Sequence, residues 1–286
     1  MSLKSLIKVP LVLAENVVFR LFPRLRPVIE HYLFNPLDFK TDHIGYSKQK
    51  FQEFSARVSI AKIRDAHILE LGPGGSIGFG LLALENGARH YTAIDDGLHT
   101  FVEGALIERY SKLLNGNQGA LNTYFSFFPD KPPHYRAEKI DFAAIDQESR
   151  YPIPDASVDI IYSCAVLEHV HDLDLCFAEM TRVLRPGGTM YHEVDLRDHI
   201  FSQKSLFFLT LSDHWFRTLF QNTGGYVNRK RISCYRSLAE KYGLSLVALE
   251  EKNESPAPTV PQRIVNQYSE EDLRTLSFIA VFLKNE

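Results

Sequence analysis

A glycine-rich turn directly after an apolar segment is the feature that most constrains the fold of this chain. Residues 66–69 are mainly apolar and lead into residues 70–75, which read Glu-Leu-Gly-Pro-Gly-Gly. Because glycine has no Cβ, the backbone of such a strand-to-helix turn can approach a ligand closely. A second apolar run, residues 90–94, ends in Asp95 and Asp96, where an acid can accept the hydroxyls of a ribose. Together these features predict a nucleoside-containing cofactor at the carboxyl ends of parallel strands.

The rest of the chain alternates between strand and helix patterns. Strands are expected near residues 68 and 92 and over residues 135–140, 158–163 and 189–194, and helices over residues 77–86, 100–114 and 173–184. This alternation predicts a parallel sheet with helices on both faces. Residues 244–249 and 278–283 are joined by a polar, proline-rich connection, which favours a closing hairpin with an antiparallel last strand.

The composition is that of an ordinary globular protein. The chain has 286 residues, of which 45% are hydrophobic, and its net charge of -3 gives no general attraction to nucleic acid. The three cysteines form neither a zinc pattern nor a disulfide framework, which is typical of a cytoplasmic protein. We therefore expect no nucleic-acid partner and no resident metal, and the oligomeric state stays open.

The N-terminal segment, residues 1–60, reads as helical pieces separated by prolines. We interpret it as a helical cap on an α/β domain at residues 61–286, which carries an aromatic-rich insert at about residues 197–240. Apolar residues at helical spacing favour a lid packed on the domain. The alternative is an amphipathic basic helix on an anionic membrane, because lysines and arginines alternate with the apolar residues.

The glycine turn departs from the dinucleotide-binding fingerprint. From Gly72 the sixth position is Ile77, and the next glycine is Gly78. The negative charge of Glu70 beside the turn would repel a pyrophosphate and would stabilise a cationic ligand. The sequence therefore disfavours a nicotinamide-dependent oxidoreductase, which we keep as an alternative function.

Five segments resemble motifs of the class I S-adenosylmethionine-dependent methyltransferases, in particular the group with a methyltransferase type 11 core. Residues 70–75 are similar to the first motif, Asp95 to the ribose-binding acid, residues 140–142 to the motif whose acid meets the adenine amino group, residues 162–170 to the fourth-strand motif, and residues 182–188 to the turn before the fifth strand. The resemblance covers roughly residues 60–195.

The resemblance implies a Rossmann-like sheet and S-adenosylmethionine as the cofactor. It implies the cofactor-binding residues Glu70, Gly72, Pro73, Gly74, Asp95, Asp96, Asp141, Phe142, Cys164 and His169. The expected reaction is methyl transfer to a small-molecule or glycan-type acceptor. A member that binds the cofactor without turnover is a further alternative.

A polar cluster follows the fifth predicted strand and supplies the candidate catalytic residues. His192, Asp195 and His199 lie within eight residues at the carboxyl end of that strand, where α/β proteins place active-site groups. A general base for an acceptor hydroxyl is one interpretation. The alternatives are a divalent metal site, although the spacing matches no standard one, and an ion-pair network that anchors the insert.

Overall fold

The structure is a computed structural model that describes residues 3–22, 44–95, 104–146, 148–201, 205–223, 226–255 and 259–286. Asp96, one of the predicted cofactor-binding residues, lies outside the described residues. Among the described helices, none is both long and apolar enough to cross a membrane.

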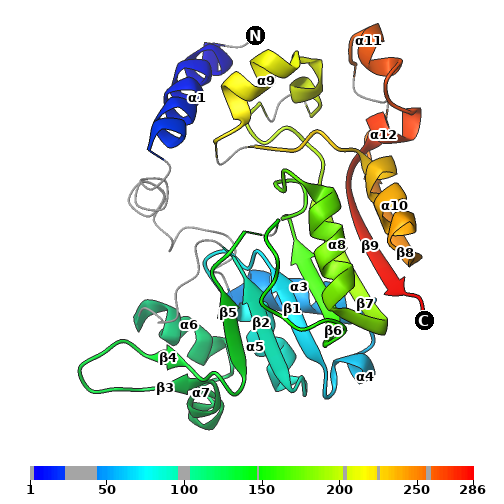
Figure 1. Cartoon of the computed structure of the whole chain (residues 1–286). Helices are drawn as coiled ribbons and strands as arrows, with labels where there is room; N and C mark the ends of the chain where they lie inside the picture. Colours follow the sequence, from blue (N-terminus) through cyan, green and yellow to red (C-terminus); the bar gives the residue numbers. More distant parts are fainter. Residues whose placement is uncertain are drawn as a thin grey trace.

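A seven-stranded sheet with the order β5-β2-β1-β6-β7-β9-β8 forms the centre of the molecule (Figure 1). The strands are β1 (His67–Leu71), β2 (His90–Ile94), β5 (Ile140–Ala143), β6 (Val158–Cys164), β7 (Leu184–Asp195), β8 (Leu244–Asn253) and β9 (Thr275–Lys284). β5, β2, β1, β6 and β7 are parallel, whereas β9 runs antiparallel to both β7 and β8. The predicted Rossmann-like sheet with an antiparallel last strand is confirmed.

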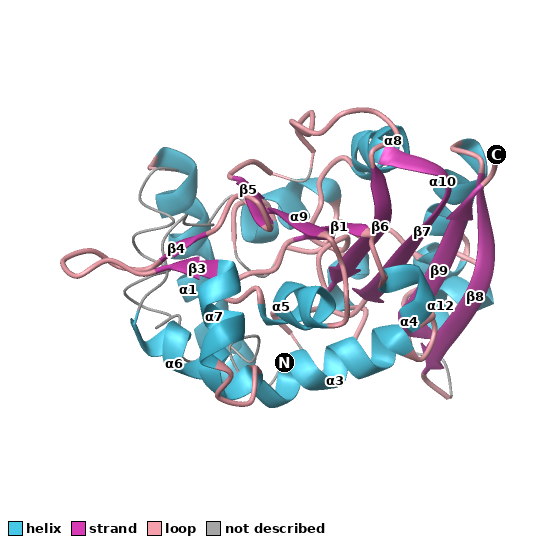
Figure 2. Ribbon diagram, turned by 90° about the horizontal axis from the view of Figure 1, so that it is seen from below, coloured by secondary structure: helices cyan, strands magenta, loops and turns pink. Residues whose placement is uncertain are grey.

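Helices cover both faces of the sheet (Figure 2). One layer holds α3 (Ile44–Ser55), α5 (Gly78–Glu85), α6 (Gly104–Leu113) and α7 (Gln118–Tyr124), with the short α4 (Ile60–Ile63) at its end, and the other holds α8 (Leu173–Val183) and α10 (Ile232–Lys241). Each layer encloses its own apolar core: Phe54 and Tyr91 lie in the first, Phe177 and Met180 in the second. The sheet is therefore buried on both sides, as its apolar strands require.

A third apolar cluster forms a lobe beside the carboxyl ends of the parallel strands (Figure 1). Its elements are α1 (Leu3–Leu21), the 3-10 helix η4 (Phe207–Thr210), α9 (Asp213–Phe220), α11 (Gln262–Val265) and α12 (Glu270–Arg274). Of the aromatic insert predicted at residues 197–240, η4 and α9 lie in this lobe. We expected the insert to be largely helical, but only about half of its described residues are in helices. α10 also belongs to that segment but packs on the sheet.

The two described N-terminal helices pack in different places. α1 packs on α9, where the Asn16 amide nitrogen donates to the Arg217 carbonyl at 3.1 Å and the Asn222 backbone N–H donates to the Asn16 amide oxygen at 3.0 Å. α3 packs on α5, so closely that a Cβ on Gly78 would lie 2.8 Å from the Ser47 Cβ. The predicted helical character is confirmed for both segments, and the division into a cap and a domain stays an interpretation.

The third parallel strand lies later in the sequence than predicted. We expected residues 135–140, but β5 is Ile140–Ala143, and Tyr135 belongs to a separate two-stranded ribbon of β3 (Phe125–Ser126) and β4 (His134–Tyr135). The Tyr135 ring packs between the rings of Phe125 and Phe142, with centroids 5.3 and 4.6 Å away. Asp141 therefore lies inside β5 and not after its end.

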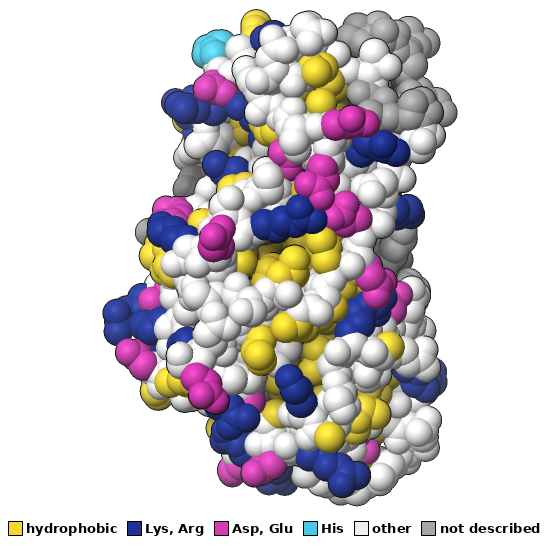
Figure 3. Space-filling view, turned by 90° about the vertical axis from the view of Figure 1, so that its right-hand side faces the viewer, with side chains coloured by type: hydrophobic (Ala, Val, Ile, Leu, Met, Phe, Trp, Pro, Cys, Tyr) yellow, Lys and Arg dark blue, Asp and Glu magenta, His cyan; other side chains and the backbone are white. Residues whose placement is uncertain are grey.

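The sheet ends in a partly protected edge at β8. Leu246 and Val247 are 41% and 57% exposed, and the strand is irregular between Leu246 and Ala248. This side of the molecule shows hydrophobic side chains interspersed with charged ones (Figure 3). An irregularity and flanking charges both discourage another strand from pairing with an exposed edge.

The contact between Gly80 and Tyr91 sets how closely α5 approaches the sheet. A Cβ on Gly80 would lie 2.4 Å from the buried Tyr91 ring. We expect Gly80→Ala to lower the free energy of unfolding by about 1–3 kcal/mol because the buried ring cannot move away without strain. As the control, Gly45→Ala in the exposed first turn of α3 meets open space and should raise stability by up to about 1 kcal/mol. Urea denaturation measures both, and equal stability of the two variants would contradict the packing argument.

Candidate functional site

The glycine turn after β1 has a backbone that other residues adopt only with strain. Gly72 and Gly74 have φ angles of +62° and +65°. The Gly72 N–H donates to the Ile94 carbonyl at 2.8 Å, which ties the turn to the end of β2. A Cβ on Gly72 would lie 2.6 Å from a Val166 methyl carbon. The turn therefore requires glycine for its φ angle and for its close approach to the segment after β6.

Asp95 lies across this turn at the end of β2. Its carboxylate accepts a hydrogen bond from the Gly74 N–H at 3.1 Å, and the side chain is partly exposed. This contact brings together the two features that the sequence singled out. An acid at this sheet edge is in the position from which α/β proteins bind a ribose.

Glu70 supplies a buried carboxyl group beneath the same turn. It is 6% exposed and accepts a hydrogen bond from the Tyr91 hydroxyl at 2.5 Å. Burial raises the pKa of Glu70 to about 8, and the hydrogen bond from Tyr91 only partly offsets this increase. A cation bound nearby would stabilise the ionised form of Glu70.

A pocket opens between the glycine turn and α3. It is lined by Tyr46, Ser47 and Lys50 of α3, by Glu70, Gly72, Pro73 and Ser76 of the turn, and by Phe79, Tyr162 and Cys164. The pocket collects four of the predicted cofactor-binding residues: Glu70, Gly72, Pro73 and Cys164. Three further lining residues, Tyr46, Ser47 and Lys50, come from α3, and the sequence analysis did not identify them.

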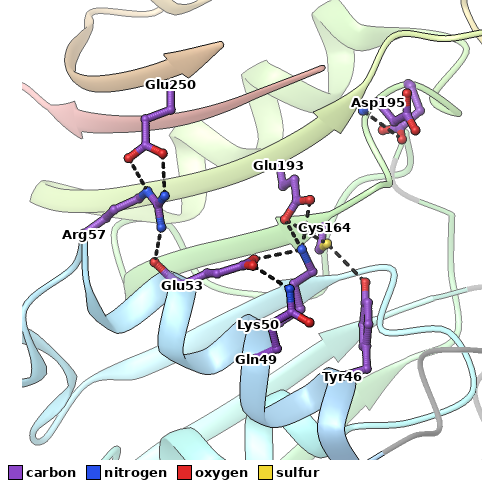
Figure 4. A network of polar contacts seen from close by, with 10 residues as sticks. Tyr46, Gln49, Lys50, Glu53, Arg57, Cys164, Glu193, Asp195 and Glu250 are labelled. Carbon is purple, nitrogen blue, oxygen red and sulfur yellow. Dashed lines mark hydrogen bonds and ion pairs between the residues drawn. The ribbon is translucent and has the colours of Figure 1, made fainter. Parts of the chain in front are cut away.

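Polar contacts join α3 to the ends of β6 and β7 (Figure 4). The Lys50 ammonium group lies 2.7 Å from the Glu193 carboxylate. The Cys164 thiol donates to Glu193 at 3.4 Å and lies 3.3 Å from the Tyr46 hydroxyl. Burial opposes the charge on Lys50, but its bonds to Glu193 and Glu53 outweigh it and raise the pKa to about 12. Lys50 therefore remains a cation on the wall of the pocket.

The sequence carried only a weak signal for Lys50. Buried Ser47, Phe51 and Phe54 are spaced by three or four residues, which is the pattern of a helix packed on a domain. That pattern predicts a helix. It does not predict that the polar face of this helix lies against the ends of β6 and β7. The pairing with Glu193 joins residues far apart in sequence, which helical spacing does not predict.

Asp141 and Phe142 point away from the sheet edge that holds Gly74 and Asp95. The Asp141 carboxylate pairs with the His90 ring nitrogen at 2.9 Å, and His90 is the first residue of β2. Phe142 packs against Tyr135. The first acid after the carboxyl end of β5 is instead Asp146, three residues beyond Ala143, which accepts from the Glu148 N–H at 2.9 Å. The sequence analysis placed the strand earlier and did not name Asp146.

Glu168 and His169 lie after β6, next to the end of β7. Glu168 is fully buried, and its carboxyl group accepts from the Asp195 N–H at 3.1 Å. Burial raises the pKa of Glu168 to about 8. His169 donates from Nδ1 to the Tyr226 carbonyl at 2.5 Å, and its ring centroid lies 5.1 Å from that of His199. The two histidines thus meet where the lobe joins the sheet.

His192 lies in the core, and its position gives no support to a catalytic role. It is 0% exposed, is bonded to the Ser163 hydroxyl at 2.8 Å, and lies between the Phe177 and Phe282 rings, with centroids 6.4 and 6.3 Å away. Burial lowers its pKa to about 3. Strand alternation explains the difference, since the same face of β7 that carries Val194 packs under α8.

Asp195 and His199 remain at the sheet edge, where their main contacts are with charged neighbours. The Asp195 carboxylate binds the Arg197 guanidinium at 2.5 Å and lies 3.8 Å from the His199 ring nitrogen. These contacts agree with the ion-pair interpretation of the cluster. Within the described ranges, no group of three His, Cys, Asp or Glu residues is arranged to hold a metal ion.

Comparison with known proteins identifies a methyltransferase domain in part of the chain. The family model for this domain matches residues 128–192, and no curated protein matches the sequence. A solved S-adenosylmethionine-dependent methyltransferase from Mesorhizobium loti is 17% identical, with a TM-score of 0.45 over 78% of this chain and 93% of that one. Another, from Methanosarcina mazei, is 16% identical, with a TM-score of 0.45 over the same shares. The predicted resemblance is confirmed, and it implies S-adenosylmethionine as the cofactor.

The raised pKa of Glu70 predicts a pH-dependent stability. Between its ordinary value of 4.5 and about 8, the folded state keeps a proton that the unfolded state releases. Stability therefore falls as pH rises through this window, by up to about 1.4 kcal/mol per pH unit. Glu70→Gln keeps an acceptor for Tyr91 but does not titrate, so its stability should fall less steeply between pH 5 and 7.5. Urea denaturation across that range tests this, and parallel curves for the two proteins would contradict it.

Proposed function

We propose that this chain, which resembles the S-adenosylmethionine-dependent methyltransferases, transfers a methyl group to a small-molecule or glycan-type acceptor. The observation that carries the proposal is the contact of Asp95 with the Gly74 N–H above the buried Glu70. This arrangement combines a close backbone approach, an acid for ribose hydroxyls and a second acid beneath the turn. The family match over residues 128–192 supports the same class of enzyme.

The residues of the pocket, together with Gly74 and Asp95 of the adjoining turn, fit the chemical groups of this cofactor. S-adenosylmethionine supplies an electrophilic methyl group on a positively charged sulfur. Glu70 lies where its carboxylate would balance positive charge, while Asp95 has acceptor atoms for hydroxyl groups. Gly72 and Gly74 keep the turn free of side chains, so the amino-acid part of a ligand can lie against the backbone.

We assign the side of the pocket formed by α3 to the carboxylate end of the cofactor. Lys50 is the cation of α3 that lines this pocket, and the Tyr46 hydroxyl lies beside it. The ammonium group already donates to Glu53 and to both oxygens of Glu193. Because it has only three donors, a ligand carboxylate would have to replace one of these bonds. α3 would also exclude water from this side of the site.

We place the acceptor at the ends of β6 and β7, beneath the lobe. His169, Asp195 and His199 are gathered there, whereas His192 is enclosed in the core. If the acceptor is a hydroxyl group, His199 is the candidate base, with Asp195 beside it. If the acceptor is a neutral amine, alignment of the two substrates is the main requirement. The aromatic side chains of the lobe suit a sugar ring or a planar acceptor.

Two alternatives are distinguished by direct assays. A nicotinamide-dependent oxidoreductase is not favoured, because Ile77 stands where the dinucleotide-binding fingerprint has its third glycine. Calorimetry with NADH and with S-adenosylmethionine separates these two classes. A member that binds the cofactor without turnover would give no labelled-methyl transfer to any component of a cell extract.

The proposed ribose contact predicts a loss of affinity in an Asp95 variant. Asp95→Ala removes a charged acceptor, so affinity for S-adenosylhomocysteine should fall by roughly 1.5–3 kcal/mol. Asp130→Ala is the matched control, because Asp130 is exposed in the loop between β3 and β4. Isothermal titration calorimetry measures both variants. Binding by Asp95→Ala with the affinity of the unmodified protein would remove Asp95 from the site.

The placement of β5 predicts which acid lies near the adenine. Asp146→Ala should weaken binding of S-adenosylhomocysteine by about fivefold or more, and Asp141→Ala by less than about twofold. The reason is position, since Asp146 lies three residues beyond the carboxyl end of β5, whereas Asp141 lies inside the strand and pairs with His90. The same titrations decide the matter. A larger loss in Asp141→Ala would restore the assignment made from the sequence.

A further inference from the structure

Over the residues whose side chains are described, from Pro10 to Leu21, the buried positions of α1 lie on one face. Val12, Asn16 and Phe19 are 8%, 5% and 5% exposed. Asn16 anchors this face on α9 through the Arg217 and Thr218 carbonyls and through Asn222. The position of α1 is therefore defined by a polar anchor between two apolar contacts.

The opposite face of α1 is apolar and exposed. Leu11, Val17 and Leu21 are 65%, 51% and 64% exposed, and Phe22, directly after the helix, is 54% exposed. At 100° per residue, Leu11, Val17 and Leu21 fall within one sector of about 120°, opposite the packed face. Single exposed apolar residues are common, but an apolar stripe that continues from Leu11 to Leu21 marks an interaction surface.

The charge of this segment indicates the kind of partner. Residues 3–22 contain Lys4, Lys8 and Arg20 but only one acid, Glu15, and Arg20 is exposed beside the apolar stripe. A helix that combines an apolar face with basic residues binds in the plane of an anionic bilayer. It is also not long and apolar enough to cross a membrane.

We propose that α1 docks this protein on the surface of an anionic membrane, with Leu11, Val17, Leu21 and Phe22 inserted at the boundary between headgroups and acyl chains. A second copy of the chain fits this face less well. The four side chains offer only a few hundred Å² of apolar surface, whereas each partner of a stable dimer buries about 800 Å². Two copies would also bring their basic residues together.

The test uses the full chain and vesicles of stated composition. In co-sedimentation, the protein should bind vesicles of phosphatidylglycerol and phosphatidylcholine more tightly than vesicles of phosphatidylcholine alone. The double variant Leu11→Gln/Leu21→Gln should lower the partition coefficient at least about tenfold, because two apolar anchors are lost. The matched control is Leu175→Gln/Leu246→Gln, at positions 44% and 41% exposed on α8 and β8, which should bind as the unmodified protein does.

Three outcomes would overturn the proposal. The unmodified protein could stay in the supernatant at every lipid concentration, or the double variant could bind as well as the control. The third is a dimer, seen by light scattering during gel filtration, that the double variant dissociates, which would assign this face to a second copy. Urea denaturation of both variants checks that the fold is kept, and cofactor titration keeps this test separate from the proposed methyltransferase function.

Discussion

The hydrogen bond between the Tyr91 hydroxyl and the Glu70 carboxyl group is the interaction on which the site depends most. It joins β1 to β2 inside the apolar core, 2.5 Å from oxygen to oxygen. The Tyr91 ring also fills the space that Gly80 leaves open on α5. One side chain thus sets the helix-to-sheet distance and holds the acid under the glycine turn. The packing of Tyr91 therefore positions the glycine turn, and the same burial sets the protonation state of Glu70.

The sequence predicted those parts of the site that depend on local backbone geometry. The φ angles of Gly72 and Gly74 and the position of Asp95 after β2 are consequences of a strand-turn-helix unit, which a short segment encodes. The error at β5 has a different origin. Residues 134–143 contain two short strand segments, each with one Phe or Tyr. The pairing of Tyr135 with Phe125 in a separate ribbon depends on tertiary contacts. The local sequence pattern does not show which segment joins the central sheet and which joins the ribbon.

The polar cluster after β7 shows why a dense set of ionisable residues is an ambiguous signal. His192 and Asp195 are three positions apart, so they lie on opposite faces of the strand. One therefore enters the core below α8 while the other reaches the charged edge. Strand alternation places the two side chains on opposite faces, but which of them is enclosed depends on the packing of α8 and α10. The role of Lys50 was hidden for a similar reason, since Glu193 is its partner only once α3 is docked.

Glu70 and Glu168 are two buried carboxyl groups with raised pKa values at the same edge of the sheet. Burial raises the pKa of each to about 8. Glu70 lies near the carboxyl end of β1, and Glu168 lies four residues after the carboxyl end of the neighbouring β6. At neutral pH both therefore hold protons that a bound cation would displace. Stability lost by burying these acids is recovered when a positively charged ligand allows them to ionise. An anionic ligand gains no such stabilisation, because it keeps both acids protonated and neutral.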